Sequence, residues 1–271
     1  MPNQYENRVV AFVDILGFKG LVEEADKNEE KRTALIEVLG NINDVSLPWK
    51  TDGTTDLQTQ NFSDSLILSA RNDSQGLWHI LFVLDHLAGK LLRMGVLVRG
   101  GVTIGPMYHD DKIVFGRGVN KAYALESTIA KYPRVILGAS AKKAAERYAS
   151  EDEVADALHH ARIVRDRDGV WYLNYLLMLA TYNSQGPVDE AAKRHTLFKD
   201  GCKIQKIIQS RIDEMIEAPD VYAKWEWLAQ YWNNTVAKLG EDGRVEGCFR
   251  RIALADGARS KRIFGQTTEL F

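Results

Sequence analysis

The sequence RVVAFVDILGF, residues 8–18, decides the fold because it joins a buried strand to a carboxylate and a turn. Residues 9–13 form an apolar, mostly β-branched run, which is typical of a buried strand. Asp14 follows this strand directly, and Gly17 and Phe18 then turn the chain into the next segment. A carboxylate at the end of a buried strand is unfavourable unless a cation compensates it, so Asp14 indicates a site for a metal ion or another positive charge.

The residues after Asp14 favour an anion next to that cation. The amides of residues 15–18 would open a helix, and free amides at a helix N-terminus bind anions. Strand, carboxylate and helix amides together indicate a site for a metal ion and phosphate. The alternative is that Asp14 only caps this helix as its first polar residue.

A second carboxylate stands in the stretch QNFSDSLILSA, residues 60–70. Asp64 lies between two serines and beside a short apolar strand, where it also fits a simple turn former. Two aspartates that each flank a buried strand fit a pair that holds Mg²⁺ or Mn²⁺, ions that prefer oxygen ligands and bind substrate phosphates. Since like charges held close repel each other, such a pair would be unfavourable without a cation.

The composition is that of a soluble globular protein. The chain has 271 residues, of which 45% are hydrophobic and 27% charged, enough for one large domain or two smaller ones. Its formal net charge of −2 gives no sign of a nucleic-acid or membrane-surface partner. Cys202 and Cys248 lack metal-ligand spacing, and no signal peptide or membrane-spanning stretch is evident. We therefore expect a reduced, cytoplasmic protein without membrane insertion.

The apolar pattern predicts alternating strands and helices over the first two thirds of the chain. Gly100 and Gly101, inside a predicted strand, imply a bulge or a close backbone approach. That strand is expected to end at Gly105 and Pro106. The predicted strands cover residues 8–13, 57–62, 65–70, 96–104, 113–115 and 135–137, with a hairpin over 161–175, and the predicted helices cover 20–45, 77–94, 118–130 and 139–149.

The order strand–helix–strand–strand–helix–strand is the ferredoxin-like arrangement of an α+β domain. Its first and third strands are neighbours, so Asp14 and Asp64 would approach each other at one edge of the sheet. From residue 185 onward the pattern is helical, with helices predicted over residues 188–216 and 221–239. The aromatic face of the second helix fits core packing, with a dimer surface as the alternative.

Four stretches of the sequence belong together: AFVDILGF (11–18), NFSDS (61–65), VRGGVTIGP (98–106) and FGRGVNKAYALES (115–127). In this order they resemble the class III nucleotide cyclase domain. Within that class the chain is most similar to the bacterial pyrimidine cyclases of the Pycsar anti-phage systems. The resemblance implies a ferredoxin-like catalytic domain over residues 1–175 and a helical C-terminal extension, packed on it, over residues 176–271.

The resemblance implies an enzyme that converts a nucleoside triphosphate into a 3′,5′-cyclic nucleotide and pyrophosphate. Asp14 and Asp64 match the two metal-binding aspartates of the family, and Ile15 matches a residue that ligates through its backbone carbonyl. Two divalent cations, Mn²⁺ or Mg²⁺, would then activate the ribose 3′-hydroxyl and bind the triphosphate.

Further positions match the substrate-binding parts of the family. Asn120 matches the asparagine that orients the ribose, and Arg165 or Arg167 falls where a basic residue holds the terminal phosphates. Gly17 and Phe18 stand at the helix opening that would receive phosphate. Because the active site of this family lies between two antiparallel protomers, the resemblance also implies a two-fold homodimer.

Two positions near these motifs depart from the family pattern. Ala124 replaces an arginine that steadies the transition-state charge four residues after the asparagine. Arg99, Arg117 and Lys121 are the candidates to substitute for it, and each also fits a plain surface or salt-bridge role. Of these, Arg99 is our predicted catalytic residue. Ser63 replaces the glycine that usually precedes the second aspartate.

The base-selecting positions also differ from those of adenylate cyclases. A lysine and an aspartate select adenine there, and by alignment Gln60 and Ile113 stand in their places. Gln60 can donate and accept hydrogen bonds at once, so it would meet the polar edge of uracil or cytosine, unless it is a strand residue that faces solvent. We predict UTP as substrate and cyclic UMP as product, with CTP or a purine nucleotide as alternatives. The resemblance further implies a separate effector protein that senses the cyclic nucleotide.

A cyclase-fold binding or scaffolding protein without turnover is the competing class of function. The arginine replaced by Ala124 makes this alternative plausible. Retention of both Asp14 and Asp64 favours the enzyme, because a scaffold has no need for two uncompensated carboxylates.

Overall fold

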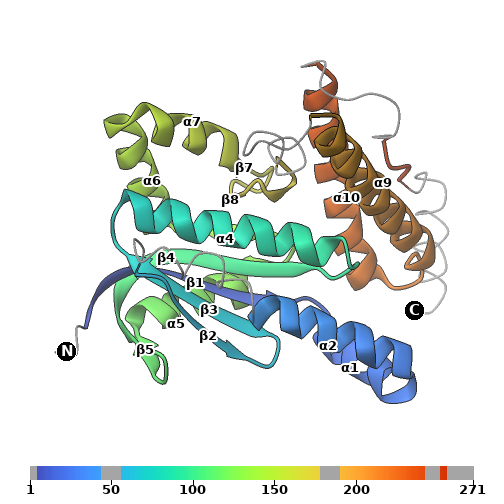
Figure 1. The fold of residues 1–271 in the computed structure, drawn as a ribbon, viewed down its shortest axis with the longest axis horizontal. Helices are drawn as coiled ribbons and strands as arrows, with labels where there is room; N and C mark the ends of the chain where they lie inside the picture. The colour runs from blue at the N-terminus through green and yellow to red at the C-terminus, as the bar shows by residue number, and fades with distance from the viewer. Residues whose placement is uncertain (1–4, 44–55, 178–189, 242–250, 255–271) are drawn as a thin grey trace, which may run out of the picture. The chain divides into compact units, whose positions relative to one another are not determined.

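The computed structural model describes residues 5–43, 56–177, 190–241 and 251–254, without the side chains of residues 43, 158, 190–199 and 239–241. The chain forms two compact units, Met1–Met178 and Leu179–Phe271. The first unit alternates strands and helices, and the described part of the second is mainly helical (Figure 1). In the described ranges, no helix is both long and apolar enough to cross a membrane.

A mixed sheet forms the centre of the first unit. Its first four strands lie in the order β2-β3-β1-β4, and every neighbouring pair among them is antiparallel. This is the ferredoxin-like order, so the prediction that the first and third strands are neighbours is confirmed. The sheet continues through β6, which is parallel to β4, to β8 and β7, and β5 pairs with the end of β4. The strands are β1 (Glu6–Ile15), β2 (Gln58–Phe62), β3 (Ser65–Arg71), β4 (Val98–His109), β5 (Val114–Gly116), β6 (Val135–Leu137), β7 (Ile163–Arg165) and β8 (Trp171–Leu173).

Helices cover both faces of this sheet. Side chains alternate along β1, so Val10 and Phe12 pack on the side of α5 while Val9 points to the opposite face. Figure 1 shows α4, which is rich in buried leucines, along that opposite face. The helices of this unit are α1 (Phe18–Lys27), α2 (Glu29–Asn43), α4 (Ser74–Leu92), α5 (Arg117–Ala124), the π-helical turn η1 (Leu125–Ile129), α6 (Ala139–Glu151), α7 (Glu153–Arg162) and the short 3₁₀ helix η2 (Tyr175–Leu177).

Glycines bring α5 and η1 very close to β4. A Cβ atom on Gly101 would lie 2.5 Å from Leu125 Cβ and 2.7 Å from the Ala122 carbonyl oxygen. A Cβ atom on Gly105 would lie 2.8 Å from Gly118 Cα. The register between β1 and β4 runs without interruption through Gly101, so the structure shows the close approach and not the alternative bulge.

Strand β4 is longer than the sequence pattern predicts. It continues through Gly105 and Pro106 to His109, so the expected end at this dipeptide is wrong. Proline has no N–H to donate to a neighbouring strand. It is tolerated here because β6 pairs with β4 only at Gly100–Val102 and β5 begins to pair at Met107, which leaves one edge of β4 open at Pro106.

Helix α7 was not expected from the sequence, which predicted a strand from residue 161. The Asp152 side chain caps this helix by accepting a hydrogen bond from the Ala155 amide at 2.8 Å. Arg162, in its last turn, forms a buried ion pair with Asp85 of α4 and lies over the Phe82 ring. This contact between distant segments favours helix over strand, and propensity alone could not reveal it.

The second unit has its own apolar contacts. Its helices are α9 (Glu190–Glu214) and α10 (Pro219–Glu241), close to the two predicted helices. Aromatic residues on α10 and isoleucines on α9 are buried, and core packing of the aromatic face against the sheet domain stays a prediction. Cys202 is disulfide-bonded, so the expectation of reduced thiols is wrong, because the sequence spacing of cysteines does not give their distance. The packing of this unit on the first stays a prediction.

Replacing Gly101 by alanine tests the close packing of α5 and η1 on β4. We expect Gly101→Ala to lower the free energy of unfolding by about 1–3 kcal/mol, because the new methyl group meets backbone atoms. Gly20→Ala is the matched control, since a Cβ atom there has no atom within 4 Å and α1 gains helix propensity. Urea unfolding of both variants measures the difference. Equal stability of Gly101→Ala and wild type would contradict this packing.

Candidate active site

Strand pairing places the two predicted metal-binding aspartates together. Asp14 is near the end of β1, where it pairs with Ser65 of β3 on one side and with Arg99 of β4 on the other. Asp64 lies in the two-residue loop between β2 and β3. The Ile15 amide donates a hydrogen bond to the Asp64 carbonyl oxygen at 3.3 Å. The expected approach of Asp14 and Asp64 at one edge of the sheet is therefore present.

The loop that carries Asp64 requires an unusual backbone conformation. Ser63, the first of its two residues, has a φ of 55°. Glycine adopts this left-handed region readily, whereas other residues reach it at a cost of about 1–2 kcal/mol. The serine that replaces the family's glycine therefore keeps the tight turn.

Burial and charge crowding act on Asp14. Its side chain is 19% exposed. Burial and the negative charge of Asp64 raise the pKa of Asp14, and the nearby Arg99 guanidinium lowers it in part. The contact with Arg99 joins Nη2 to Asp14 Oδ2 at 3.3 Å. The net rise shows that Arg99 does not fully offset the burial of Asp14 and the charge of Asp64 beside it.

A third carboxylate, which the sequence analysis missed, lies next to this pair. Glu126 of η1 is 2% exposed, and its Oε1 lies 2.6 Å from Arg99 Nε. Burial raises the pKa of Glu126, Arg99 lowers it, and the charges of Asp14 and Asp64 raise it again. A signal was present in the sequence: Glu126 stands four residues after Ala122, on the face of the helix that packs against β4.

These residues fit hard divalent cations that arrive with a phosphate ligand. In the described ranges, no cluster of three or more His, Cys, Asp or Glu side chains is arranged to hold a metal ion. Asp14 and Asp64 supply two carboxylates, and Mg²⁺ typically takes one or two carboxylates together with waters and substrate phosphates. The donor set therefore fits Mg²⁺ or Mn²⁺ better than a metal held by protein ligands alone.

A helix N-terminus opens directly after the strand that carries Asp14. Gly17, with a φ of 77°, is the N-cap residue of α1, and Phe18 is the first residue of the helix. The alternative in which Asp14 caps this helix is therefore wrong. Because no side chain caps α1, the amides of its first turn are available to a phosphate oxygen, as expected for Gly17 and Phe18.

Asn120 does not join the carboxylates within one chain. It is exposed on α5, as is Ala124. Asn120 precedes Glu126 by six residues along a continuous helical segment, which corresponds to a rise of about 9 Å. A ribose placed at Asp14 would therefore need an asparagine from another source, such as a second copy of the chain.

The predicted base-selecting residues lie apart from each other. Gln60 is half-buried on β2, opposite Ile67. Its Oε1 is buried and has no hydrogen-bond partner among the described residues. Ile113 is 53% exposed and follows the far end of β4, where its amide donates to Asp110 Oδ1. Only Gln60 therefore presents an unused polar atom.

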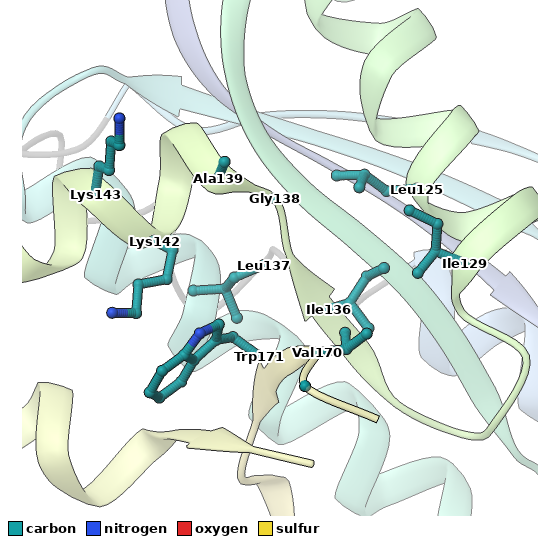
Figure 2. A pocket seen from close by; sticks show the side chains of 11 residues that line it. Leu125, Ile129, Ile136, Leu137, Gly138, Ala139, Lys142, Lys143, Val170 and Trp171 are labelled. Atoms are coloured by element: carbon teal, nitrogen blue, oxygen red, sulfur yellow. The ribbon is translucent and has the colours of Figure 1, made fainter. Parts of the chain in front are cut away.

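The predicted phosphate-binding arginines lie on the hairpin of β7 and β8. Arg165 of β7 lies 5.9 Å from the Trp171 ring centroid, and Arg167 is exposed in the following turn. Trp171 also lines an open pocket of about 410 Å³ between η1, β6, α6 and this hairpin (Figure 2). Lys142 lies over the Trp171 ring at 4.2 Å, and Lys143 reaches the same pocket. The structure does not bring Arg165 or Arg167 to Asp14 within one chain.

Several solved structures resemble this chain at low sequence identity. No family model and no curated protein matches it. A bacterial light-regulated adenylyl cyclase is 15% identical with a TM-score of 0.42, over 64% of this chain and 94% of that one. A second structure of such a cyclase is 13% identical with a TM-score of 0.40, over 74% and 59%. A class III adenylyl cyclase-like ATP-binding protein from Pseudomonas aeruginosa is 13% identical with a TM-score of 0.39, over 51% and 34%.

The raised pKa values of Asp14 and Glu126 predict a pH dependence of the metal-free protein. Between the ordinary carboxyl pKa near 4 and the raised folded values, the folded state binds more protons than the unfolded chain, so stability rises as pH falls. Asp14→Asn removes one of these groups. We expect wild type to gain stability relative to Asp14→Asn as the pH falls from neutrality toward the ordinary carboxyl pKa. Urea unfolding with a chelator measures this difference, and a loss would contradict the crowding.

Proposed function

We propose that this chain is a nucleotide cyclase of the class III type, which converts a nucleoside triphosphate into a 3′,5′-cyclic nucleotide and pyrophosphate. The observation that carries the proposal is the pairing of Asp14 and Asp64 at one sheet edge, beside the open N-terminus of α1. The motif resemblance of residues 11–18, 61–65, 98–106 and 115–127 supports the same reaction.

In the proposed reaction, the ribose 3′-hydroxyl oxygen bonds to the α-phosphorus while the bond from that phosphorus to the bridging oxygen of the β-phosphate breaks. The hydroxyl proton leaves to water and the electron pair departs with pyrophosphate. Two divalent cations held by Asp14, Asp64 and the Ile15 carbonyl would supply Lewis-acid stabilisation of the hydroxyl and the phosphates. The amides at the start of α1, from Phe18 onward, would bind phosphate oxygens, and Arg99 would offset the charge that develops on them.

The site would be completed by a second copy of the chain in a homodimer. The exposed position of Asn120 on α5 supports this arrangement, because its side chain is open to a partner protomer. Arg165 and Arg167, which lie at the opposite edge of the sheet from β2, would likewise reach the triphosphate of the partner's site. Asn120 would orient the ribose there.

We propose UTP as the substrate, with CTP as the alternative pyrimidine. The unpartnered Oε1 of Gln60 would accept a hydrogen bond from the uracil N3–H, while its amide NH₂ donates to O4. A site that hydrogen-bonds such an edge discriminates strongly, since a wrong base leaves buried polar groups unpaired. The chain would produce cyclic UMP as an anti-phage signal for a separate effector protein.

A cyclase-fold nucleotide-binding or scaffolding protein without turnover is the second candidate. Ala124, in the place of the family's transition-state arginine, favours it. The crowded carboxylates Asp14 and Asp64 favour catalysis, because they are unfavourable in a protein that never binds a cation.

Competition among the four ribonucleoside triphosphates tests the reaction and its substrate. Purified protein with Mn²⁺ and all four nucleotides should form cyclic UMP as the dominant product, measured by mass spectrometry. Asp14→Ala and Asp64→Ala should each abolish the product while the protein remains folded. Cyclic AMP or cyclic GMP as the dominant product would overturn the pyrimidine proposal. Cyclic CMP as the dominant product would overturn only the choice of UTP. Absence of any cyclic product would favour the scaffold.

Mixed dimers test whether the site is shared between protomers. Asp14→Ala and Asn120→Ala proteins should each be inactive alone, and their mixture should recover partial activity, because one of the two hybrid sites keeps both residues. Subunit exchange is verified with two affinity tags. No recovery in dimers that carry both tags would contradict a shared site.

A further inference from the structure

The buried Glu126 is a feature that the proposed reaction does not explain. The crowded pair of Asp14 and Asp64 is already unfavourable, and Glu126 adds a third negative charge within reach of both. A buried carboxylate destabilises a protein unless its contacts compensate it. The contact that compensates Glu126 is its ion pair with Arg99, in which Glu126 Oε1 lies 2.6 Å from Arg99 Nε.

Arg99 uses two different edges of its guanidinium in this cluster. Its Nε lies 2.6 Å from Glu126 Oε1 as an ion pair without hydrogen-bond alignment, and its Nη2 donates a hydrogen bond to Asp14 Oδ2 at 3.3 Å. A guanidinium is planar, so its Nε and Nη groups move together. The charge attraction of Glu126 therefore holds the Nε end beside η1, while the Nη2 end lies on the side of Asp14.

The backbone that carries Glu126 is also held firmly. Glu126 belongs to the π-helical turn η1, and such turns often occur at functional sites. Leu125 and the Glu126 amide lie within 3.2 Å of the position that a Cβ atom on Gly101 would take, two residues after Arg99 in β4. The glycine contact thus sets the distance between the two elements that carry Glu126 and Arg99.

We propose that Glu126 is a positioning residue that holds the Arg99 guanidinium with its Nη groups toward the site at Asp14 and Asp64. In the metal-free protein Arg99 partly compensates Asp14. When a triphosphate and its cations bind, the cations compensate Asp14, and the Nη groups contact phosphate oxygens while Glu126 retains Nε. This inference rests on the proposed function, since it requires a phosphate ligand at this site.

The sign of one substitution separates positioning from simple charge. If Glu126 acted only through its charge, Glu126→Gln would strengthen the binding of an anion, because one negative charge is removed. If Glu126 positions Arg99, the same variant weakens anion binding, because the guanidinium loses its orientation. Loss of such a supporting contact typically costs about 10-fold or more in affinity.

The experiment measures binding of inorganic tripolyphosphate, with Mg²⁺ present, by calorimetric titration of the full chain. This probe carries the phosphate charge without a base or ribose, so its binding does not depend on the choice of UTP. We expect Glu126→Gln to weaken binding about 10-fold and Glu126→Asp to restore part of the loss. Glu151→Gln is the matched control, since Glu151 makes only an exposed ion pair with Arg147 at 4.0 Å.

A double-mutant cycle with Arg99 completes the test. In an Arg99→Ala background, Glu126→Gln should cause no further loss of tripolyphosphate affinity. Tighter binding in that background is also consistent with the inference, because the substitution removes a negative charge. An equal loss of tripolyphosphate affinity in both backgrounds would overturn the inference. So would a Glu126→Gln variant that binds tripolyphosphate as tightly as wild type or more tightly. If Glu126→Gln does not fold, Arg99→Lys replaces it in the test. A lysine ammonium cannot hold the orientation of a guanidinium, so this variant should bind tripolyphosphate more weakly. Binding as tight as that of wild type would overturn the inference.

The outcomes also separate this inference from the proposed function. A wild-type protein that does not bind tripolyphosphate contradicts both. A wild-type protein that binds it, with Glu126→Gln binding equally well, contradicts only the positioning role and leaves the cyclase proposal standing.

Discussion

The charge balance around Asp14 is the constraint on which the proposed site depends. Asp14, Asp64 and Glu126 bring three carboxylates to one edge of the sheet, and Arg99 contacts two of them. Burial and mutual repulsion raise the pKa values of Asp14 and Glu126 despite Arg99. Such a cluster is unfavourable on its own, and this imbalance is what motivates the proposal of divalent cations at Asp14 and Asp64.

The topology explains how residues far apart in the sequence meet at this edge. Strand β1 lies between β3 and β4, so residues at its end have neighbours on both sides. The β2–β3 loop supplies Asp64 from one side, and β4 supplies Arg99 from the other. Because both pairings are antiparallel, the end of β1, the start of β3 and the start of β4 lie together at the same end of the sheet. The ferredoxin-like order thus builds the site.

The same close packing that stabilises the sheet also places the third carboxylate. Gly101, Gly105 and Gly118 let the segment α5–η1 approach β4 to backbone contact. This close approach brings Glu126 of η1 beside Arg99 of β4. Fold stability and charge arrangement therefore depend on the same glycines, and a substitution there would affect both.

Local periodicity and one topological rule were enough to predict the order of strands and helices in residues 8–149, the ferredoxin-like arrangement and the meeting of Asp14 and Asp64. Only the tertiary structure decided the continuation of β4 through Pro106, the helix α7 that Arg162 anchors to Asp85, and the contact of Glu126 with Arg99. These features depend on which edges and charges lie opposite each other in space. Sequence spacing does not record such distances, since they arise when separate elements pack together.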